Sequence, residues 1–269
     1  MFRSITAALL LATLSCAPAT DGVDGAGLHY VSSGAGPAII FVHGWTCDTT
    51  AWAEQLPEFE DDYQAIALDL PGHGQSAAPV DGVYTMDLFA DAVEDVRAEV
   101  GADAIVLVGH SMGVSVIRQY ALKYPERVAG LVIVDGGLPL PVDGEAEPAP
   151  IPPADSPWRE QMIDSMFVDA TTPELRARIR EMMLQASDEQ ALAIAMSMRD
   201  PARWSDRTIE APVLAVMAST REMPDPDAYE TVIPKLEMLQ LPGTGHFLMR
   251  EVPEKFNNLM RKFLQDIGY

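Results

Sequence analysis

The chain has 269 residues, of which 48% are hydrophobic and 22% are charged, a balance that is ordinary for a folded globular protein and argues against intrinsic disorder. The 40 acidic residues against 18 basic ones give a formal net charge of −22, and the acidic residues are spread along the chain. A surface this negative repels phosphate backbones and anionic membranes, so we expect no nucleic-acid partner.

The first 19 residues have the layout of a secretory signal peptide. An early arginine precedes an apolar run at residues 5–14, which is too short for a stable membrane span, and the A-P-A at 17–19 offers a cleavage site. We therefore expect residues 1–19 to be a signal peptide and the protein to be exported, to the periplasm or beyond. Cys16 leaves lipid anchoring open as a second route, because its surroundings are similar to a bacterial lipobox in which Thr13 replaces the usual leucine.

Between residues 28 and 137, short apolar segments alternate with segments of helical hydrophobic spacing. Strands are expected at 28–33, 38–42, 63–69, 104–108 and 128–137. Helices are expected at 85–100 and 113–124. Thr85 can cap the first of these helices, and Pro125 ends the second. The alternation predicts βαβ units and an α/β fold with a mostly parallel sheet covered by helices on both faces.

An insertion is expected at residues 138–205. It begins with a proline-rich stretch, which is a linker composition. Three helical patterns follow, near 158–168, 173–186 and 188–199. Six methionines lie between Met162 and Met198, and a deformable thioether suits either packing on the body or lining a pocket. We expect a helical lid over an apolar pocket, with plain packing on the body as the alternative.

The parallel pattern resumes after the insertion. Strands are expected at 211–219 and 235–243, and a closing helix begins at Pro253, so residues 20–269 form one domain that carries the lid. The glycines at 34 and 36 are predicted to form a hairpin turn, not a dinucleotide fingerprint. The sequence contains no cluster of zinc-ligand type, and we expect neither a cofactor nor a metal ion.

Residues 105–115 read IVLVGHSMGVS, an apolar strand that runs into a serine with a glycine two places to either side. G-x-S-x-G between a buried strand and a helix is the nucleophile elbow. The strained turn presents Ser111 above the sheet. Gly109 and Gly113 are needed because side chains there would collide with neighbouring backbone. The first N–H groups of the following helix have no intrahelical acceptor and can point at bound substrate.

Four motifs occur in the order and at the spacings typical of the α/β-hydrolase fold superfamily. They are FVHGW at 41–45, DLPGHGQS at 69–76, LVGHSMG at 107–113 and PGTGHFLMREVPEKF at 242–256. The chain resembles the lid-bearing, esterase-like members of that superfamily, roughly from Leu28 to the C-terminus, although the lid matches only in type. The resemblance implies an eight-stranded, mostly parallel twisted sheet with an inserted helical lid.

The same resemblance implies the site residues. Ser111 matches the nucleophile, and His246, which follows the last strand, matches the general base. The backbone N–H groups of Trp45 and Met112 match the oxyanion-hole donors, each contributing ~3 kcal/mol of transition-state stabilisation. We expect the Trp45 side chain to pack at the mouth of the pocket. The other four histidines are expected to be hydrogen-bonding loop residues: His29, His43, His73 and His110.

The resemblance leaves the acid of the triad open. The family most often places it after the seventh strand, where Glu222 and Asp225 lie, although an acidic residue there can simply cap the helix that follows. The other location is the end of the sixth strand, where Asp135 follows LVIV. We favour Asp135, with Glu222 and then Asp225 as alternatives. The acid accepts the hydrogen bond from His246 Nδ1 and stabilises the imidazolium.

A serine with an oxyanion hole fits acyl transfer, whereas dehalogenases and epoxide hydrolases on this fold need a carboxylate nucleophile. The resemblance therefore implies a serine hydrolase that cleaves a carboxylic ester or lactone of a small apolar substrate through an acyl-enzyme. The alternative is a hydrolase-fold ligand receptor or binding protein with little turnover. Intact Ser111 and His246 favour the enzyme.

Overall fold

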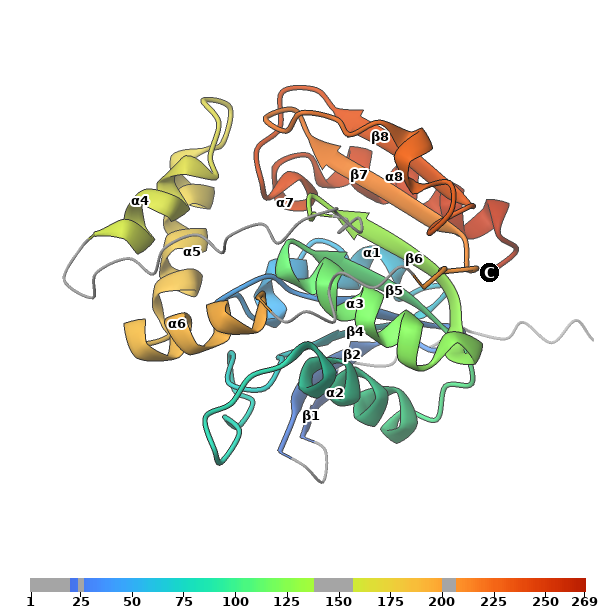
Figure 1. Ribbon diagram of the computed structural model, residues 1–269, viewed down its shortest axis with the longest axis horizontal. Coiled ribbons are helices and arrows are strands. Elements are labelled where there is room, and N and C mark those ends of the chain that lie inside the picture. The colour runs from blue at the N-terminus through green and yellow to red at the C-terminus, as the bar shows by residue number, and fades with distance from the viewer. Residues whose placement is uncertain (1–19, 24–26, 138–156, 200–206) are drawn as a thin grey trace, which may run out of the picture.

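The computed structural model describes residues 20–23, 27–137, 157–199 and 207–269. Within these residues an eight-stranded sheet runs through the molecule in the order β1-β2-β4-β3-β5-β6-β7-β8 (Figure 1). Its strands are β1 (Thr20–Val23), β2 (His29–Ser33), β3 (Ala38–Val42), β4 (Gln64–Leu68), β5 (Ile105–His110), β6 (Val128–Val134), β7 (Val213–Ala218) and β8 (Leu236–Leu241). The last six strands in this order are parallel to one another, namely β4, β3, β5, β6, β7 and β8. Strand β2 is antiparallel to both β1 and β4.

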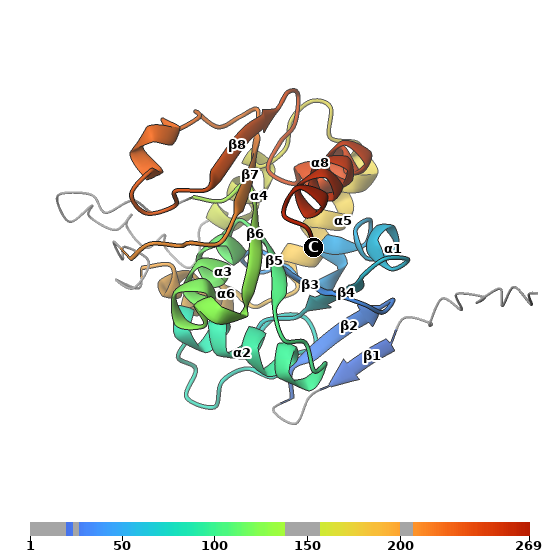
Figure 2. The same ribbon diagram turned by 90° about the vertical axis from the view of Figure 1, so that its right-hand side faces the viewer.

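Helices cover both faces of this sheet. The helices are α1 (Leu56–Phe59), α2 (Met86–Glu99), α3 (Met112–Lys123), α4 (Trp158–Ser165), α5 (Pro173–Leu184), α6 (Asp188–Ser197), α7 (Leu248–Glu251) and α8 (Pro253–Asp266). Figure 2 shows α2 and α3 on one face and α1 and α8 on the other. None of the helices in the described ranges combines the length and the apolar character needed to cross a bilayer.

The central strands are buried along their whole length. Every residue of β3, β5 and β7 is buried, because helices lie on both faces and leave no side of these strands to solvent. This is why their sequences read as continuous apolar runs instead of alternating ones. The predicted mostly parallel sheet of about eight strands, covered on both faces, is confirmed.

The predicted helix boundaries also hold. The Thr85 side chain accepts a hydrogen bond from Leu88 N at 3.0 Å and so caps α2. Helix α3 ends at Lys123, and Pro125 begins a short 3-10 helix, η2 (Pro125–Arg127).

Two features differ from the predictions. The turn at Gly34 and Gly36 is not a hairpin, because β4 lies between β2 and β3 in the sheet. Gly34 is required there instead by its φ of +77° and by packing, since a Cβ would lie 2.2 Å from the Glu60 carbonyl oxygen. Strand β1 was not predicted, because the four residues TDGV carry almost no apolar pattern.

The three helices predicted after residue 157 are confirmed as α4, α5 and α6. They follow β6 and precede β7 in the chain, and Figure 1 shows them beyond the carboxyl ends of these two strands. Catalytic groups of α/β proteins gather at that edge of the sheet. The predicted signal peptide at 1–19 and the predicted linker at 138–156 lie outside the described residues.

Candidate active site

Ser111 occupies a sharp turn between β5 and α3, with φ 54° and ψ −114°. A Cβ on Gly109 would lie 2.6 Å from the Gly113 carbonyl oxygen, and a Cβ on Gly113 would lie 2.4 Å from the Val42 carbonyl oxygen. Both obstacles are backbone atoms, which cannot swing aside as a side chain can. The predicted need for glycine on either side of the serine is therefore confirmed.

Asp135 and His246 are brought together at the same edge of the sheet. Asp135 directly follows β6, is 2% exposed, and its Oδ2 lies 2.5 Å from His246 Nδ1. Its other oxygen, Oδ1, accepts a hydrogen bond from Ala218 N and lies 2.9 Å from Arg221 Nε. Burial acts to raise the pKa of Asp135, but His246, the Ala218 amide and Arg221 together outweigh it, so this pKa lies below its ordinary value.

The two alternative acids lie elsewhere. Glu222 and Asp225 are both exposed. Asp225 accepts a hydrogen bond from Asp227 N at 3.1 Å and caps the 3-10 helix η4 (Pro226–Tyr229). Of the three candidates, Asp135 is therefore the one with a hydrogen bond to His246.

Arg221 is a contributor that the sequence did not single out. Besides its ion pair with the Asp135 carboxylate, its Nη2 donates to the Asp135 carbonyl oxygen at 3.1 Å. It lies in the loop after β7, where the family's acid was sought, so the position in the chain was the one available signal. This cation adds to the effect of His246 and the Ala218 amide in holding the pKa of Asp135 below its ordinary value.

Backbone strain is concentrated around this site. Among the described residues, three that are not glycine have a positive φ: Thr46, Ser111 and Asp135. A left-handed conformation is unusual for any of them and costs most for a β-branched residue such as Thr46. All three lie in loops that follow the carboxyl ends of parallel strands, which fits a site whose side chains are aimed by the backbone.

The segment that carries His246 is fastened to the helical insertion. His246 N donates to the Met166 carbonyl oxygen at 2.9 Å, and a Cβ on Gly245 would lie 2.6 Å from that same oxygen. Glu251 joins the two segments again, since its carboxylate accepts from Gly245 N at 2.6 Å and from Thr171 Oγ1 at 2.9 Å. Movement of the insertion would therefore act directly on the position of His246.

The predicted oxyanion-hole residues flank the serine. Met112 begins α3, so its N–H has no acceptor within the helix. Gly44 packs on Ser111, since a Cβ there would lie 3.1 Å from Ser111 Cβ, and Trp45 follows Gly44 in the chain. The buried Trp45 indole donates from Nε1 to the Ala191 carbonyl oxygen at 2.8 Å, and its ring lies 5.7 Å from that of Trp158. The indole thus packs beneath α4 and α6.

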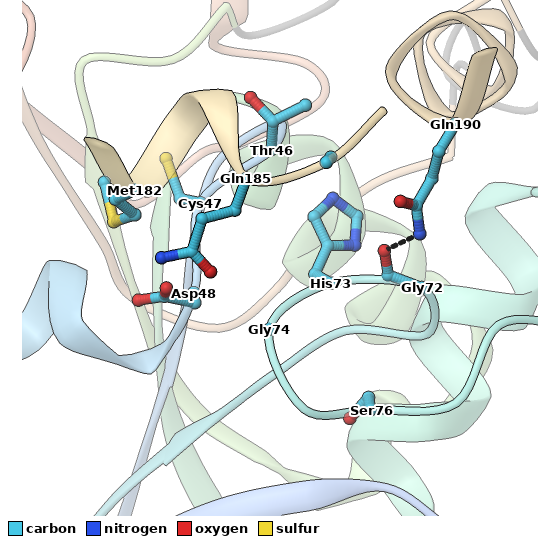
Figure 3. A pocket seen from close by; sticks show the side chains of 11 residues that line it. Thr46, Cys47, Asp48, Gly72, His73, Gly74, Ser76, Met182, Gln185 and Gln190 are labelled. Carbon is cyan, nitrogen blue, oxygen red and sulfur yellow. Dashed lines mark hydrogen bonds between the residues drawn. The ribbon is translucent and has the colours of Figure 1, made fainter. Parts of the chain in front are cut away.

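A polar pocket of about 160 Å³ begins at Thr46, the residue next to Trp45 in the chain, and is called the pocket beside Trp45 below (Figure 3). Residues 46–48 form one wall, and residues 72–74 with Ser76 form another. Helices α5 and α6 and their connection close it with Met182, Gln185 and Gln190. The insertion therefore offers this pocket two amides beside a methionine, a more polar lining than the apolar one expected from the sequence.

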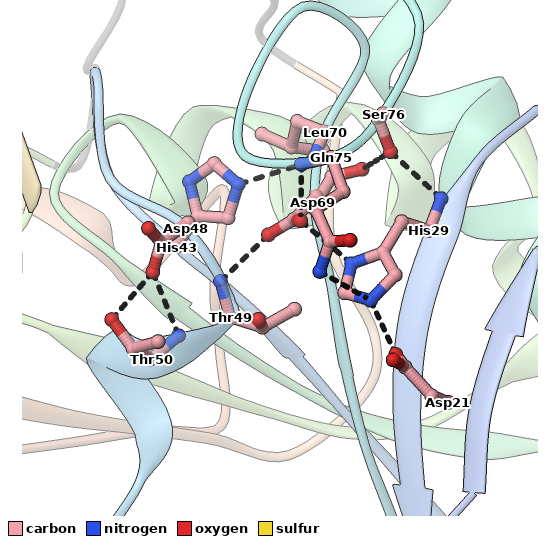
Figure 4. Close-up of polar contacts among 10 residues, drawn as sticks. All are labelled: Asp21, His29, His43, Asp48, Thr49, Thr50, Asp69, Leu70, Gln75 and Ser76. Carbon is pink, nitrogen blue, oxygen red and sulfur yellow. Dashed lines mark hydrogen bonds and ion pairs between the residues drawn. The ribbon is translucent and has the colours of Figure 1, made fainter. Parts of the chain in front are cut away.

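Buried Asp69, which follows β4, ties the two walls of this pocket together (Figure 4). Its Oδ1 accepts from Thr49 N at 2.7 Å, and its Oδ2 accepts from Gln75 N at 2.8 Å. His29 Nδ1 lies 2.7 Å from the same Oδ2, and His29 Nε2 lies 2.5 Å from Asp21 Oδ1. The Asp69 carboxylate thus connects strand β2 with the two loop segments that carry the walls, through Thr49 next to the first wall and Gln75 within the second loop.

The four histidines other than His246 all take part in hydrogen bonds, as predicted, but only His43 and His73 lie in loops. His29 begins β2 and His110 ends β5. His43 accepts from Leu70 N at 3.0 Å, and His110 Nε2 lies 2.9 Å from the His246 carbonyl oxygen. Burial and the neighbouring His246 lower the pKa of His110 to about 3, so it stays neutral. Within the described parts of the chain, no group of three or more His, Cys, Asp or Glu side chains is placed to hold a metal ion.

A family model described as the alpha/beta hydrolase fold matches residues 37–251. The chain therefore belongs to the α/β-hydrolase fold family, in agreement with the sheet order, the elbow and the Asp135–His246 pair described above.

The solved structures that resemble most of the chain include the following two. One is a thermophilic esterase from Thermogutta terrifontis, which is 27% identical with a TM-score of 0.77 and covers 94% of this chain and 100% of its own. Another is Est816, described as an N-acyl homoserine lactone degrading enzyme, which is 25% identical with a TM-score of 0.74 and covers 91% of this chain and 100% of its own. These similarities support a hydrolytic enzyme of the α/β-hydrolase class.

Epoxide hydrolase 3 of Mus musculus is similar over a shorter stretch. It is 35% identical over 112 residues, which is 40% of this chain. The chain spans 30% of the length of that relative.

Proposed function

We propose that this protein is a serine hydrolase that cleaves a carboxylic ester or lactone of a small apolar substrate through an acyl-enzyme. The observation that carries the proposal is the pairing of buried Asp135 with His246 at the sheet edge where the elbow presents Ser111. A carboxylate, an imidazole and a serine at one edge are the parts of a nucleophilic triad.

The proposed reaction has two halves. Ser111 Oγ attacks the carbonyl carbon while His246 takes its proton, and Asp135 stabilises the imidazolium from Nδ1. The N–H groups of Trp45 and Met112 stabilise the oxyanion. Collapse of the tetrahedral intermediate expels the alcohol, which receives its proton from His246. Water then attacks the acyl-serine with His246 as base, releasing the acid and restoring Ser111.

Ester chemistry is favoured over epoxide opening, although epoxide hydrolases are among the similar proteins. Opening an epoxide on this fold needs a carboxylate nucleophile, and this chain has Ser111 at the elbow.

The helical insertion and the N-terminus complete the proposal. We expect α4–α6 to act as a lid over the site, since the Met166 carbonyl oxygen accepts from His246 N and the Ala191 carbonyl oxygen accepts from the Trp45 indole.

We also expect the protein to be exported after cleavage at residue 19. Mass spectrometry of the protein from its native host should find Thr20 first, and an intact Met1 or a lipidated Cys16 would contradict cleavage there.

Steady-state hydrolysis of a short p-nitrophenyl ester tests the function. Wild-type protein should turn over many equivalents of ester, and Ser111→Ala should not. Ser115→Ala, which changes a serine four residues further on in helix α3, should retain activity. A single stoichiometric burst would instead indicate a binding protein with little turnover, and equal activity in Ser111→Ala would refute the acyl-enzyme.

A further inference from the structure

The pocket beside Trp45 lies within reach of a substrate bound at Ser111. Gly44 packs against the nucleophile, and Thr46, which lines the pocket, is two residues further on. Two residues of extended chain span at most about 7 Å. A substituent a few atoms from the reacting carbonyl can therefore enter this pocket.

Two buried polar atoms in the pocket lining have no hydrogen-bond partner, namely His73 Nε2 and Thr46 Oγ1. Both side chains are 3% exposed, so bulk water does not satisfy them. Buried polar groups are normally paired, because an unpaired one gives up its hydrogen bonds to water without replacement. Two such atoms at one pocket indicate a place for a polar ligand group.

The chemistry of His73 defines what that ligand must offer. Burial and the neighbouring His43 lower the pKa of His73 to about 3, so the imidazole is neutral. Nδ1 lies 3.1 Å from the Pro71 carbonyl oxygen, which can only accept, so Nδ1 carries the proton. Nε2 is therefore a hydrogen-bond acceptor without a donor. Figure 3 shows this ring standing between Gln185 and Gln190.

The remaining lining favours the same kind of ligand. The Asp48 carboxylate adds acceptor oxygens, and the Thr46 hydroxyl can either donate or accept. Thr46 is held at φ 54°, which is strained for a β-branched residue and is tolerated where surrounding structure enforces it. Gln190 is fixed by donating to the Gly72 carbonyl oxygen at 2.5 Å.

We propose that this pocket is a polar subsite of the active site and that it takes a hydroxyl group carried by the substrate a few atoms from the reacting carbonyl. The hydroxyl donates to His73 Nε2 and accepts from Thr46 Oγ1. A volume of about 160 Å³ suits a group of benzene size, since an engineered cavity of ~150 Å³ binds benzene. The proposal rests on the proposed ester hydrolysis and names a feature of its substrate.

Matched esters test the proposal. Two series are compared, one with the hydroxyl on the acyl chain and one with it on the alcohol, each against the ester in which a methyl group replaces the hydroxyl at equal length. Wild-type kcat/KM should be about tenfold higher for the hydroxy ester at one chain length. His73→Asn keeps a donor near Nδ1 but lacks Nε2, and Thr46→Val keeps the shape. Both should abolish the preference, read as the ratio of kcat/KM between the hydroxy ester and its methyl partner within the same variant.

A binding measurement by NMR tests whether the pocket takes the hydroxyl group in the absence of turnover. In Ser111→Ala labelled with ¹⁵N-histidine, the hydroxy ester should shift the His73 Nε2 resonance and the methyl ester should not. Equal kcat/KM for both members of every pair, or an unmoved Nε2 resonance, would overturn the subsite and leave the esterase standing. Failure of the proposed function would appear differently, as no Ser111-dependent hydrolysis of any ester, while the Nε2 shift would still report on the pocket.

Discussion

His246 Nδ1 lies 2.5 Å from Asp135 Oδ2, although 111 residues separate the two in the chain. Asp135 follows β6 and His246 follows β8, so the pair exists only because parallel strands bring their carboxyl ends to one edge of the sheet. The Asp135 carboxylate is also bound by Ala218 N and Arg221. These two residues lie at the end of β7 and in the loop after it, and β7 lies between β6 and β8 in the sheet. Three neighbouring strands thus hold one carboxylate in place.

Replacing Asp135 by asparagine should lower kcat by ~10³–10⁴ while the fold survives, because the amide does not hold the His246 tautomer or stabilise the imidazolium. Steady-state kinetics on a p-nitrophenyl ester, with circular dichroism for the fold, measures this. Glu222→Gln and Asp225→Asn are the matched controls and should keep near wild-type kcat. The reverse pattern would show that Asp135 is not the acid.

Stability should depend on pH through His29. Burial acts to lower the pKa of His29, but hydrogen bonds to Asp21 and Asp69 outweigh it and raise the pKa above its ordinary value. The stability that these pairs contribute is therefore present below the unfolded-state pKa of about 6.5 and is lost as pH rises through the folded one.

Asp21→Asn removes one partner and should cost free energy of unfolding in urea at about pH 5.5 but little at about pH 9. The effect should stay below about 1 kcal/mol, because the Asp21 side chain is 72% exposed. Asp61→Asn, at an exposed carboxylate, should show no such difference between the two pH values. A larger cost at high pH would contradict the assignment.

Trp45→Phe should weaken the attachment of α6. The variant loses the indole donor to the Ala191 carbonyl oxygen, at a cost of ~1 kcal/mol in free energy of unfolding. Trp52→Phe is the matched control, because Trp52 Nε1 is buried without a partner and its loss removes no hydrogen bond. The proposal uses only the Trp45 amide in catalysis, so kcat should fall less than about tenfold. Equal destabilisation of both variants would argue against the bond.

Gly113→Ala should destabilise the protein by ~1–3 kcal/mol or more, because the added methyl group would lie 2.4 Å from the Val42 carbonyl oxygen. Urea unfolding of the variant measures this. Gly137→Ala is the control, since a Cβ there meets nothing within 4 Å, and its stability should change by less than about 0.5 kcal/mol. A Gly113→Ala protein as stable as wild type would contradict the close packing at the elbow.

The sequence predicted the sheet well because buried parallel strands leave continuous apolar runs. The runs at β3, β5 and β7 stand out for that reason. Strand β1 went unpredicted because it lies at the edge of the sheet and its pattern is almost wholly exposed. The place of β4 between β2 and β3 was equally invisible, since strand order depends on crossovers and not on local pattern.

At the site, the sequence could identify side chains but not their partners. Ser111 and His246 were predicted from motifs. The choice among three acids needed the distance to His246, which depends on strand order. Arg221 and the hydrogen bond from His246 N to Met166 O went unpredicted because neither has a local signature. The polar pocket beside Trp45 arises from three segments that are distant in sequence, so its lining could not be read from any one of them.

Covalent labelling with a fluorophosphonate tests directly whether Ser111 is the nucleophile. An activated serine attacks phosphorus and loses fluoride, leaving a stable adduct on its Oγ. We expect one adduct per chain, mapped by peptide mass spectrometry to Ser111, and none in Ser111→Ala. A wild-type protein that stays unlabelled while it hydrolyses esters, or an adduct at any other residue, would contradict a nucleophilic role of Ser111.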